Sequence, residues 1–328
     1  MKVMQIGYGY WGNNVAKKLL ASSMFEFVYL AESDETKRNN AIAQLPKEVQ
    51  IVDNYEDYLD SDIEGVVICT QTEYSFEIAM KAMEKGKHVF TEKPLATTVE
   101  RSVKMIEKAK EKGVVLHCDH LMVYNPVIRY IKRMIDEGEL GEIMYIDISR
   151  INLGPIRKDI NAMLDLAVHD IAVIDYLTNG LEPDELNAVG TSFFGNQETI
   201  TYLTMKQGDM LVNINSSWIS PVKTRKTVIA GTKKMVIFDD VSMDKLYIYD
   251  SGINIVPGSI YGEYEYQTRV GDIFVPHIVY YDSLQKSLEH FATCVVEGKE
   301  SLSGPSQSLR VMKILEAAQE KLRAGRND

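Results

Sequence analysis

Lys93 is a candidate for acid–base chemistry in this 328-residue chain because of the residues around it. It stands in the segment KHVFTEKPLA, residues 87–96, just after a predicted strand. Pro94 restricts the residue before it to extended conformations, so the backbone holds Lys93 more firmly than an ordinary surface lysine. A lysine held in this way can hydrogen-bond a hydroxyl group and, if burial lowers its pKa, share its proton.

Asp165 and His169 form a second candidate for this chemistry. They are four residues apart in NAMLDLAVHDIAVIDYL, residues 161–177, which predicts a mostly apolar helix. At this spacing the two side chains share one face, where a carboxylate can orient an imidazole and stabilise its protonated form. A buried helix tolerates such a pair only when its hydrogen bonds are satisfied, so the pair is either structural or functional. Together with Lys93 and a cofactor site, the pair is predicted to be catalytic.

The segment GYGYWG supplies evidence for that cofactor. Gly7, Gly9 and Gly12 have the spacing G-x-G-x-x-G and lie directly between a predicted strand and a predicted helix. In this context the first glycine makes a tight turn, the second lets the backbone approach a pyrophosphate, and the third lets helix and strand pack closely. The positive end of the helix dipole then faces the phosphates. The segment predicts a dinucleotide site.

Glu32, at the end of the second predicted strand, bears on which dinucleotide is bound. A carboxylate there can accept hydrogen bonds from the adenosine ribose and repels a 2'-phosphate, which favours NAD. Ser33, Lys37 and Arg38 can build a phosphate site if Glu32 turns aside, so NADP stays the less favoured alternative. The predicted cofactor-binding residues are Gly7, Tyr8, Gly9, Tyr10, Trp11, Gly12, Glu32, Ser33, Thr70, Gln71, Glu92 and Lys93.

The elements around these residues predict two domains. In residues 1–119, near-continuous apolar strands alternate with helices, which is typical of an α/β domain with a doubly wound parallel sheet, the Rossmann fold. In residues 120–328, segments such as EIMYIDISRIN alternate apolar and polar residues and short turns join them. This pattern predicts a C-terminal α+β domain with a large, mostly antiparallel open sheet, with helices near 126–137, 161–177 and 306–323.

Composition limits the possible partners. The net charge of -11, without a dense basic cluster, argues against nucleic acid or anionic lipid, and no apolar run is long enough to cross a membrane. The three cysteines are far apart and have no paired histidines, so neither a disulfide framework nor a metal site is predicted. We expect a cytoplasmic protein that acts on small molecules.

The ordered motifs GYGYWG, EKP and DLAVH, followed by a sheet domain, resemble the Gfo/Idh/MocA oxidoreductases, and the resemblance covers essentially the whole chain. It implies an NAD(P)-dependent enzyme in which Lys93, Asp165 and His169 are catalytic. It also implies a C-terminal sheet with an exposed face that forms a homodimer or homotetramer, and a Lys93–Pro94 peptide bond that is often cis in the family.

The chain departs from the family pattern at two places. TQTEYS stands where the family commonly has T-P-x-x-x-H, which puts Gln71 in place of the proline and Ser75 in place of the histidine. LMVYNP lacks the arginine that polyol dehydrogenases of the family often carry before a D-P pair, which disfavours free inositol or glucose. The polar run SRINLGPIRKDIN stands in place of those contacts. The stretches RINLG...DLAVHD and WISPVKTRKTVIAGTKKM resemble the branch that acts on nucleotide-linked sugars, such as UDP-N-acetylglucosamine 3-dehydrogenases.

The predicted reaction is the NAD-dependent oxidation of a secondary hydroxyl, at C3, of a nucleotide-activated sugar such as UDP-N-acetylglucosamine to the ketone. Guanidinium groups bind phosphates well, and the polar run contains two arginines. The predicted substrate-binding residues are Tyr124, Asn125, Arg150, Asn152, Arg157 and Asn161. The alternatives are a ketoreductase on a keto nucleotide sugar, an inositol or monosaccharide dehydrogenase, and a catalytically silent NAD-binding regulator.

Overall fold

The computed structural model describes residues 1–257 and 264–325, which form two compact units. The first unit comprises Met1–Asn125 and Tyr281–Lys313, and the second comprises Pro126–Tyr280 and the chain from Ile314 onward. This division differs from the predicted continuous boundary after residue 119, because a late segment of the chain returns to the first unit. Each unit is described separately below.

The first unit is built on a six-stranded parallel sheet with the order β3-β2-β1-β4-β5-β6. Its strands are β1 (Lys2–Ile6), β2 (Glu26–Ala31), β3 (Gln50–Val52), β4 (Gly65–Ile68), β5 (His88–Thr91) and β6 (Leu116–Cys118). Its helices include α1 (Tyr10–Ala21), α2 (Glu35–Gln44), α3 (Thr72–Glu84) and α4 (Val99–Lys112), with 3-10 turns at Glu56–Tyr58 and Leu121–Tyr124. The predicted doubly wound Rossmann sheet is confirmed.

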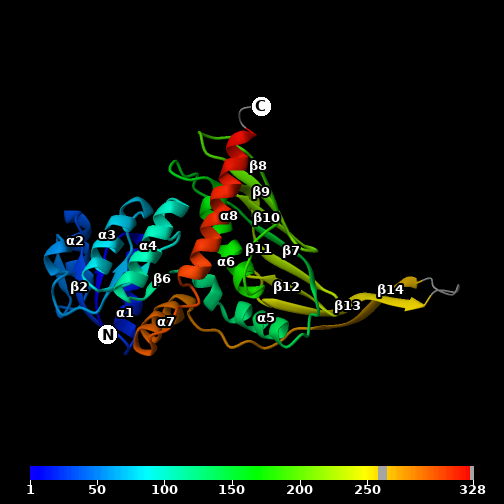
Figure 1. Cartoon of the computed structure of the whole chain (residues 1–328), viewed down its shortest axis with the longest axis horizontal. Coiled ribbons are helices and arrows are strands. Elements are labelled where there is room, and N and C mark those ends of the chain that lie inside the picture. Colours follow the sequence, from blue (N-terminus) through cyan, green and yellow to red (C-terminus); the bar gives the residue numbers. More distant parts are fainter. Residues whose placement is uncertain (258–263, 326–328) are drawn as a thin grey trace. The chain divides into compact units, whose positions relative to one another are not determined.

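A further helix, α7 (Ser283–Glu297), belongs to the first unit and was not predicted. Leu288 and Phe291 of α7 are fully buried in the same apolar cluster as Val15 and Leu19 of α1. Phe291 also meets Phe90 of β5 edge-on, with 5.8 Å between the ring centroids. Figure 1 shows α7, in orange, beside α1. The helix covers apolar sheet surface that the first 119 residues leave exposed, which explains why it joins this unit.

The second unit is built on an eight-stranded sheet with the order β14-β13-β12-β11-β7-β10-β9-β8. Only the β7–β10 pair is parallel among the described strand pairs of this sheet, so the predicted mostly antiparallel sheet is confirmed. The strands are β7 (Ile143–Leu153), β8 (Glu185–Thr191), β9 (Ile200–Gln207), β10 (Met210–Ser217), β11 (Ile219–Gly231), β12 (Met235–Asp239), β13 (Leu246–Pro257) and β14 (Tyr264–Phe274).

Helices α5 (Pro126–Asp136) and α6 (Val168–Leu177) pack against each other in the second unit, and a π-helical turn, Met163–Ala167, leads into α6. Helix α8 (Pro305–Ala324) begins in the first unit and ends in the second. On β7, Ile146 and Ile148 are buried while Tyr145 is 40% exposed, as the alternating pattern predicts. None of the helices within residues 1–257 and 264–325 combines the length and apolar character needed to cross a membrane.

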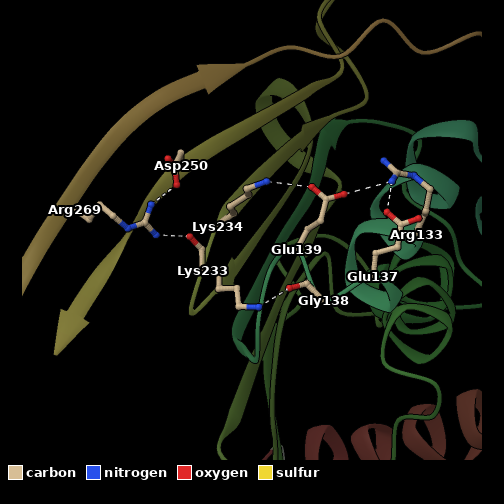
Figure 2. Close-up of polar contacts among 8 residues, drawn as sticks. All are labelled: Arg133, Glu137, Gly138, Glu139, Lys233, Lys234, Asp250 and Arg269. Atoms are coloured by element: carbon tan, nitrogen blue, oxygen red, sulfur yellow. Dashed lines mark hydrogen bonds and ion pairs between the residues drawn. The ribbon is translucent and has the colours of Figure 1, made fainter.

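Strands β13 and β14 run beyond the edge formed by the other strands of their sheet (Figure 1). Figure 2 shows how polar contacts anchor the base of this hairpin: Arg269 of β14 contacts Asp250 of β13 and the Lys233 carbonyl. Lys233 Nζ in turn donates to the Gly138 carbonyl at 3.1 Å, just after α5. The hairpin is therefore tied both to its own sheet and to the end of α5.

Candidate active site

The glycine-rich loop follows β1 and its shape depends on two glycines. Gly7 has a φ of +96°, and a Cβ there would lie 2.7 Å from the Cys69 carbonyl oxygen. A Cβ on Gly12 would lie 2.4 Å from the Gly7 carbonyl oxygen. The fully buried Gln5 donates from Nε2 to the Gly7 and Gly12 carbonyls, at 2.8 Å each. The turn is thus held by close backbone packing and by one buried amide.

Gly9 differs, since its backbone is ordinary (φ -74°) and a Cβ there would have no neighbour among the described residues within 4 Å. It stands at the N-terminus of α1, where unpaired N–H groups favour an anion. The space beside Gly9 opens into a pocket of about 270 Å³ lined by Tyr8, Gly9, Tyr10, Asn13, Lys37, Asn40 and Gln44. This loop fits a dinucleotide pyrophosphate, because the backbone can approach it without obstruction.

Glu32 lies beside this loop and is only 8% exposed. Its carboxylate accepts hydrogen bonds from the Tyr8 N–H at 2.7 Å and the Asp34 N–H at 3.0 Å. Arg38 donates to the Glu32 carbonyl at 2.9 Å and to the Ser33 carbonyl at 2.6 Å. The carboxylate is therefore fixed in place at the end of β2, and Arg38 is engaged with backbone oxygens.

The residues after β4 are arranged around a short hydrogen-bonded turn. Ser75, 1% exposed, donates from Oγ to the Gln71 carbonyl at 3.1 Å and lies 3.2 Å from Thr70 Oγ1. Gln71 is the N-cap of α3. The serine that stands in place of the family histidine thus stabilises the turn that carries Thr70 and Gln71, two of the residues predicted to contact the cofactor.

The ends of β5 and β6 bring together a group of ionisable side chains. The Lys93–Pro94 peptide bond is cis. Trp11 Nε1 donates a hydrogen bond to Glu92 Oε1. Asp119 follows β6, and its N–H donates to the Thr91 carbonyl at 2.8 Å, one residue before Glu92. Because β5 and β6 are parallel neighbours, Glu92, Lys93 and Asp119 all lie at the carboxyl ends of the strands, on the same side of the sheet.

Burial and mutual charge strongly perturb these groups. Burial, and then the nearby Asp119, raises the pKa of Glu92 well above its usual value. Burial raises the pKa of Asp119 to about 7, against the opposing effects of a Ser287 hydrogen bond and the Lys93 charge. Burial, assisted by Lys93, lowers the pKa of His120 to about 3. Near Lys93, two carboxyl groups thus have raised pKa values and one imidazole has a lowered pKa. Strongly shifted pKa values of this kind are typical of a catalytic centre.

In the second unit, Asp165 lies within the π-helical turn Met163–Ala167 and His169 lies in the first turn of α6. The Asp165 carboxylate accepts from Trp218 Nε1 at 3.3 Å and from Arg157 Nη1 at 3.3 Å. Trp218 is 2% exposed, so it is a core residue of this unit. A π-turn often marks a functional position in a helix, and here it carries the predicted carboxylate.

Arg150 was predicted to bind substrate, and the structure places it in a buried ion pair. Its Nε lies 2.9 Å and 3.0 Å from the two carboxylate oxygens of Asp170, and its Nη2 lies 2.6 Å from Oδ1. Asp170 is 1% exposed and directly follows His169 on α6. The bidentate pair ties β7 to α6, so Arg150 is well placed to hold the helix that carries His169.

The other predicted substrate residues fall into different surroundings. Asn161, 5% exposed, donates to Glu198 at 2.9 Å and accepts from the Leu164 N–H at 3.0 Å, so it caps the turn before α6. Arg157 pairs with Asp159 and Asp165, and its side chain remains 43% exposed. The structure places Tyr124 and Asn125 in the first unit, Tyr124 in its buried interior, and Asn152 beside Gly154 in the second.

Three functional candidates were missed at the sequence level: Gln5, Asp119 and His120. Gln5 is a polar residue inside a buried parallel strand, which is itself a signal that the side chain has a specific partner. Asp119 and His120 come directly after β6, and ligands of open parallel sheets lie outside the carboxyl ends of the strands. Applying that rule to every strand of the first domain would have found both.

Comparisons with known proteins identify the family of both halves of the chain. Residues 1–120 match the family model described as an oxidoreductase family with an NAD-binding Rossmann fold, and residues 128–237 match the GFO/IDH/MocA C-terminal domain. The scyllo-inositol 2-dehydrogenase (NAD(+)) of Bacillus subtilis is 26% identical over 312 residues, 90% of this chain and 86% of that protein. The UDP-N-acetylglucosamine 3-dehydrogenase of Acidithiobacillus ferrooxidans is 27% identical over 261 residues, 79% and 80% of the two chains.

Solved structures share the fold. UDP-N-acetylglucosamine 3-dehydrogenase GnnA from Acidithiobacillus ferrooxidans superimposes with a TM-score of 0.82 at 21% identity, covering 99% of this chain and 98% of that one. GenD2 from gentamicin A biosynthesis, solved in complex with NAD, gives a TM-score of 0.81 at 19% identity, covering 99% and 95%. With both halves matched, the chain belongs to the Gfo/Idh/MocA family of oxidoreductases with an NAD-binding Rossmann fold.

Proposed function

We propose that the protein is an NAD-dependent dehydrogenase that oxidises a secondary hydroxyl, at C3, of a nucleotide-activated sugar such as UDP-N-acetylglucosamine to the ketone. The observation that carries the reaction type is the position of Lys93, at the end of β5 in the unit that also holds the glycine-rich loop and Glu32. In a Rossmann domain the nicotinamide lies outside such strand ends, so Lys93 can reach a hydroxyl presented to it.

We assign the following roles to the residues of this chain. Bound NAD supplies the acceptor for the carbinol hydride. Lys93 hydrogen-bonds the reacting oxygen and stabilises the charge that develops on it. His169 accepts the hydroxyl proton, and Asp165, fixed by Trp218 and Arg157, favours the protonated imidazole.

Glu32 supports NAD over NADP. Its carboxylate is fixed by two backbone N–H groups at the position where the adenosine ribose binds in this fold. A 2'-phosphate would meet a negative charge there, and the nearest guanidinium, Arg38, is already bonded to two carbonyls. For Arg38 to bind the 2'-phosphate of NADP, its hydrogen bonds to the Glu32 and Ser33 carbonyls would have to break.

Two observations support a phosphate-bearing sugar. Similarity to UDP-N-acetylglucosamine 3-dehydrogenase extends over 79% of the chain. Arg157 and Lys158 lie on the exposed segment before α6. Arg157 is 43% exposed, so a diphosphate can compete with its partners Asp159 and Asp165, whereas Arg150 is buried against Asp170 and serves as a support. The first test is the appearance of NADH absorbance when purified protein is mixed with NAD and a panel of UDP- and dTDP-sugars beside myo-inositol and glucose. Turnover with free polyols alone would refute the nucleotide-sugar assignment.

The catalytic roles are tested by Lys93→Ala and His169→Ala. Each should lower kcat by about 10²- to 10⁴-fold and leave the Kd for NAD nearly unchanged. Because both residues are proposed to act on one hydroxyl, the double variant should lose little more than the worse single variant. Multiplicative losses, or an equal loss of NAD binding, would contradict the proposal.

An inositol dehydrogenase is the second candidate, because scyllo-inositol 2-dehydrogenase is similar over 90% of the chain. The substrate panel separates the two candidates directly. A ketoreductase would instead consume NADH with a keto sugar, and a silent regulator would bind NAD without turnover of any substrate.

We further propose that the protein is a homodimer or homotetramer joined through the second unit's sheet. Tyr145 of β7 and Leu211 of β10 are paired neighbours on this sheet and are 40% and 49% exposed. Tyr202 of β9 adds a third exposed apolar side chain, at 44%. Light scattering should report a dimer or larger, and Leu211→Lys should shift it toward monomer.

A further inference from the structure

We propose that Phe193 and Phe194, in the loop between β8 and β9, bind the base of the nucleotide sugar by stacking against its ring. The inference deepens the proposed function and rests on it, because that function requires a substrate with a nucleoside diphosphate. Residues 192–198 are called the aromatic loop below. They form the base subsite, and the diphosphate lies beside Arg157 and Lys158.

The aromatic loop has a fixed backbone and two exposed rings. Phe193 is 62% exposed and Phe194 is 57% exposed. The Phe193 N–H donates to Thr199 Oγ1 at 3.3 Å, and Ser192 Oγ donates to the Gly195 carbonyl at 2.7 Å. Aromatic side chains gain the most when such apolar surface is covered. The loop therefore presents two adjacent rings to a ligand while its backbone stays in place.

The pairing of the strands places the aromatic loop at one particular end of the second unit's sheet. Thr191 of β8 pairs with Ile200 of β9, and Ile200 pairs with Ser217 of β10. Ser217 in turn pairs with Ile151 of β7. These residues form one row across the sheet. The aromatic loop thus leaves the sheet at the same end as the segments that follow β7 and β10.

The aromatic loop also contacts the segment that carries the two cations. Gln197 Nε2 donates to the Lys158 carbonyl at 3.3 Å. The next residue, Glu198, accepts at its carbonyl from the Ala162 N–H at 2.9 Å. The loop therefore lies along the exposed segment that begins with Arg157 and leads to the π-helical turn.

The cations in turn adjoin the proposed catalytic carboxylate. Arg157 Nη1 lies 3.3 Å from Asp165 Oδ1, and Trp218 Nε1 donates to Asp165 Oδ2 at 3.3 Å. The Trp218 N–H donates to the carbonyl of Thr199, just after the aromatic loop, at 3.0 Å. The aromatic loop, the cations and the carboxylate are thus joined by direct contacts within one unit.

This order of side chains matches the order of parts in a nucleotide sugar. The base has a flat face that stacks on aromatic rings. The diphosphate suits a guanidinium group, and the sugar then extends toward Asp165. The net charge of -11 disfavours a polynucleotide, so the stacked base belongs to a small ligand. A free polyol would have no part to place on the two rings.

The experiment is a calorimetric titration of UDP into the whole protein saturated with NAD, so that the glycine-rich loop is already occupied. Phe193→Leu/Phe194→Leu keeps apolar bulk but removes both rings, and it should raise the Kd for UDP by about tenfold or more. Phe193→Tyr/Phe194→Tyr keeps the rings and should bind UDP nearly as tightly as the wild type. The Kd for NAD should stay unchanged in both variants. An unchanged Kd for UDP in the leucine variant would overturn the proposal.

Stacking also has a spectroscopic signature. The uracil H5 and H6 resonances of UDP should move upfield on binding to the wild type and much less on binding to the leucine variant. The matched control is Phe274→Leu, which changes another exposed phenylalanine of the same unit, 58% exposed on β14, and should leave UDP binding unchanged. If the leucine variant changes its oligomeric state in light scattering but keeps its UDP affinity, the rings belong to a contact between copies and the proposal fails.

Failure of this proposal can be told apart from failure of the proposed function. If nucleotide sugars are oxidised and the leucine variant binds UDP like the wild type, the function stands and the base subsite is wrong. If UDP binding depends on the two rings and no sugar is oxidised, the base subsite stands and the dehydrogenase function fails. If the wild type does not bind UDP, the base subsite and the nucleotide-sugar assignment both fail.

Discussion

Gly9 and Gly12 belong to the same glycine-rich loop, and the structure predicts that alanine at the two positions will have opposite consequences. A Cβ on Gly12 would lie 2.4 Å from the Gly7 carbonyl oxygen and 3.1 Å from the Gly7 carbonyl carbon. These are backbone atoms that cannot move without distorting the turn. We expect Gly12→Ala to lower the free energy of unfolding by about 1–3 kcal/mol, as overpacking does in a close-packed interior.

Gly9→Ala should leave folding nearly unchanged. The backbone at Gly9 suits alanine, and the described residues leave open space around its Cβ. We expect the free energy of unfolding to change by less than about 0.5 kcal/mol. The new methyl group would, however, occupy the space that a pyrophosphate needs to reach the N-terminus of α1. The Kd for NAD should therefore rise by about tenfold or more, equivalent to about 1.4 kcal/mol.

The assay is urea unfolding followed by fluorescence, together with calorimetric titration of NAD into each folded variant. Gly12→Ala should lose both stability and affinity, while Gly9→Ala should lose affinity alone. If Gly9→Ala binds NAD as tightly as the wild type, the loop does not hold a pyrophosphate in the way argued here. If Gly9→Ala unfolds as readily as Gly12→Ala, the space around Gly9 is not open and the two glycines do not differ in packing.

Three more predictions concern single side chains. Glu32→Gln should raise kcat/KM with NADP relative to NAD by about tenfold, because it removes the charge that repels a 2'-phosphate; an unchanged ratio would contradict the role of Glu32. Arg150→Ala should cost about 3–5 kcal/mol in urea unfolding, because it leaves Asp170 buried and unpaired, and Arg150→Ala/Asp170→Ala should recover part of this. The contribution of Asp119 to stability should fall as pH rises from about 4 to about 7, since unfolded Asp119 ionises first while its native pKa is raised to about 7; the free energy of unfolding of the wild type minus that of Asp119→Asn should therefore decrease over this range, in which the effects of the buried histidines cancel.

Much of the site could be predicted from the sequence because its backbone is specified locally. Gly7 and Gly12 are needed for turn geometry within a few residues of each other, and Pro94 acts on the residue directly before it. Asp165 and His169 are close in sequence and both lie in the helical segment predicted for 161–177, although Asp165 falls in the π-helical turn Met163–Ala167 and His169 in α6. The alternation of strands and helices likewise predicted both sheets, because periodicity reports which faces are buried.

Only the tertiary structure decided which distant side chains meet. His117 contacts Ser287 across 170 positions of sequence and Ser301 across 184 positions. Helix α7 carries Ser287 back to the first unit because its apolar face covers the sheet there. Arg150, which by type alone suits a phosphate, is paired with Asp170 instead. Local patterns determine backbone conformation, whereas the pairing of buried polar groups depends on how separate elements pack, and that packing is recorded only in three dimensions.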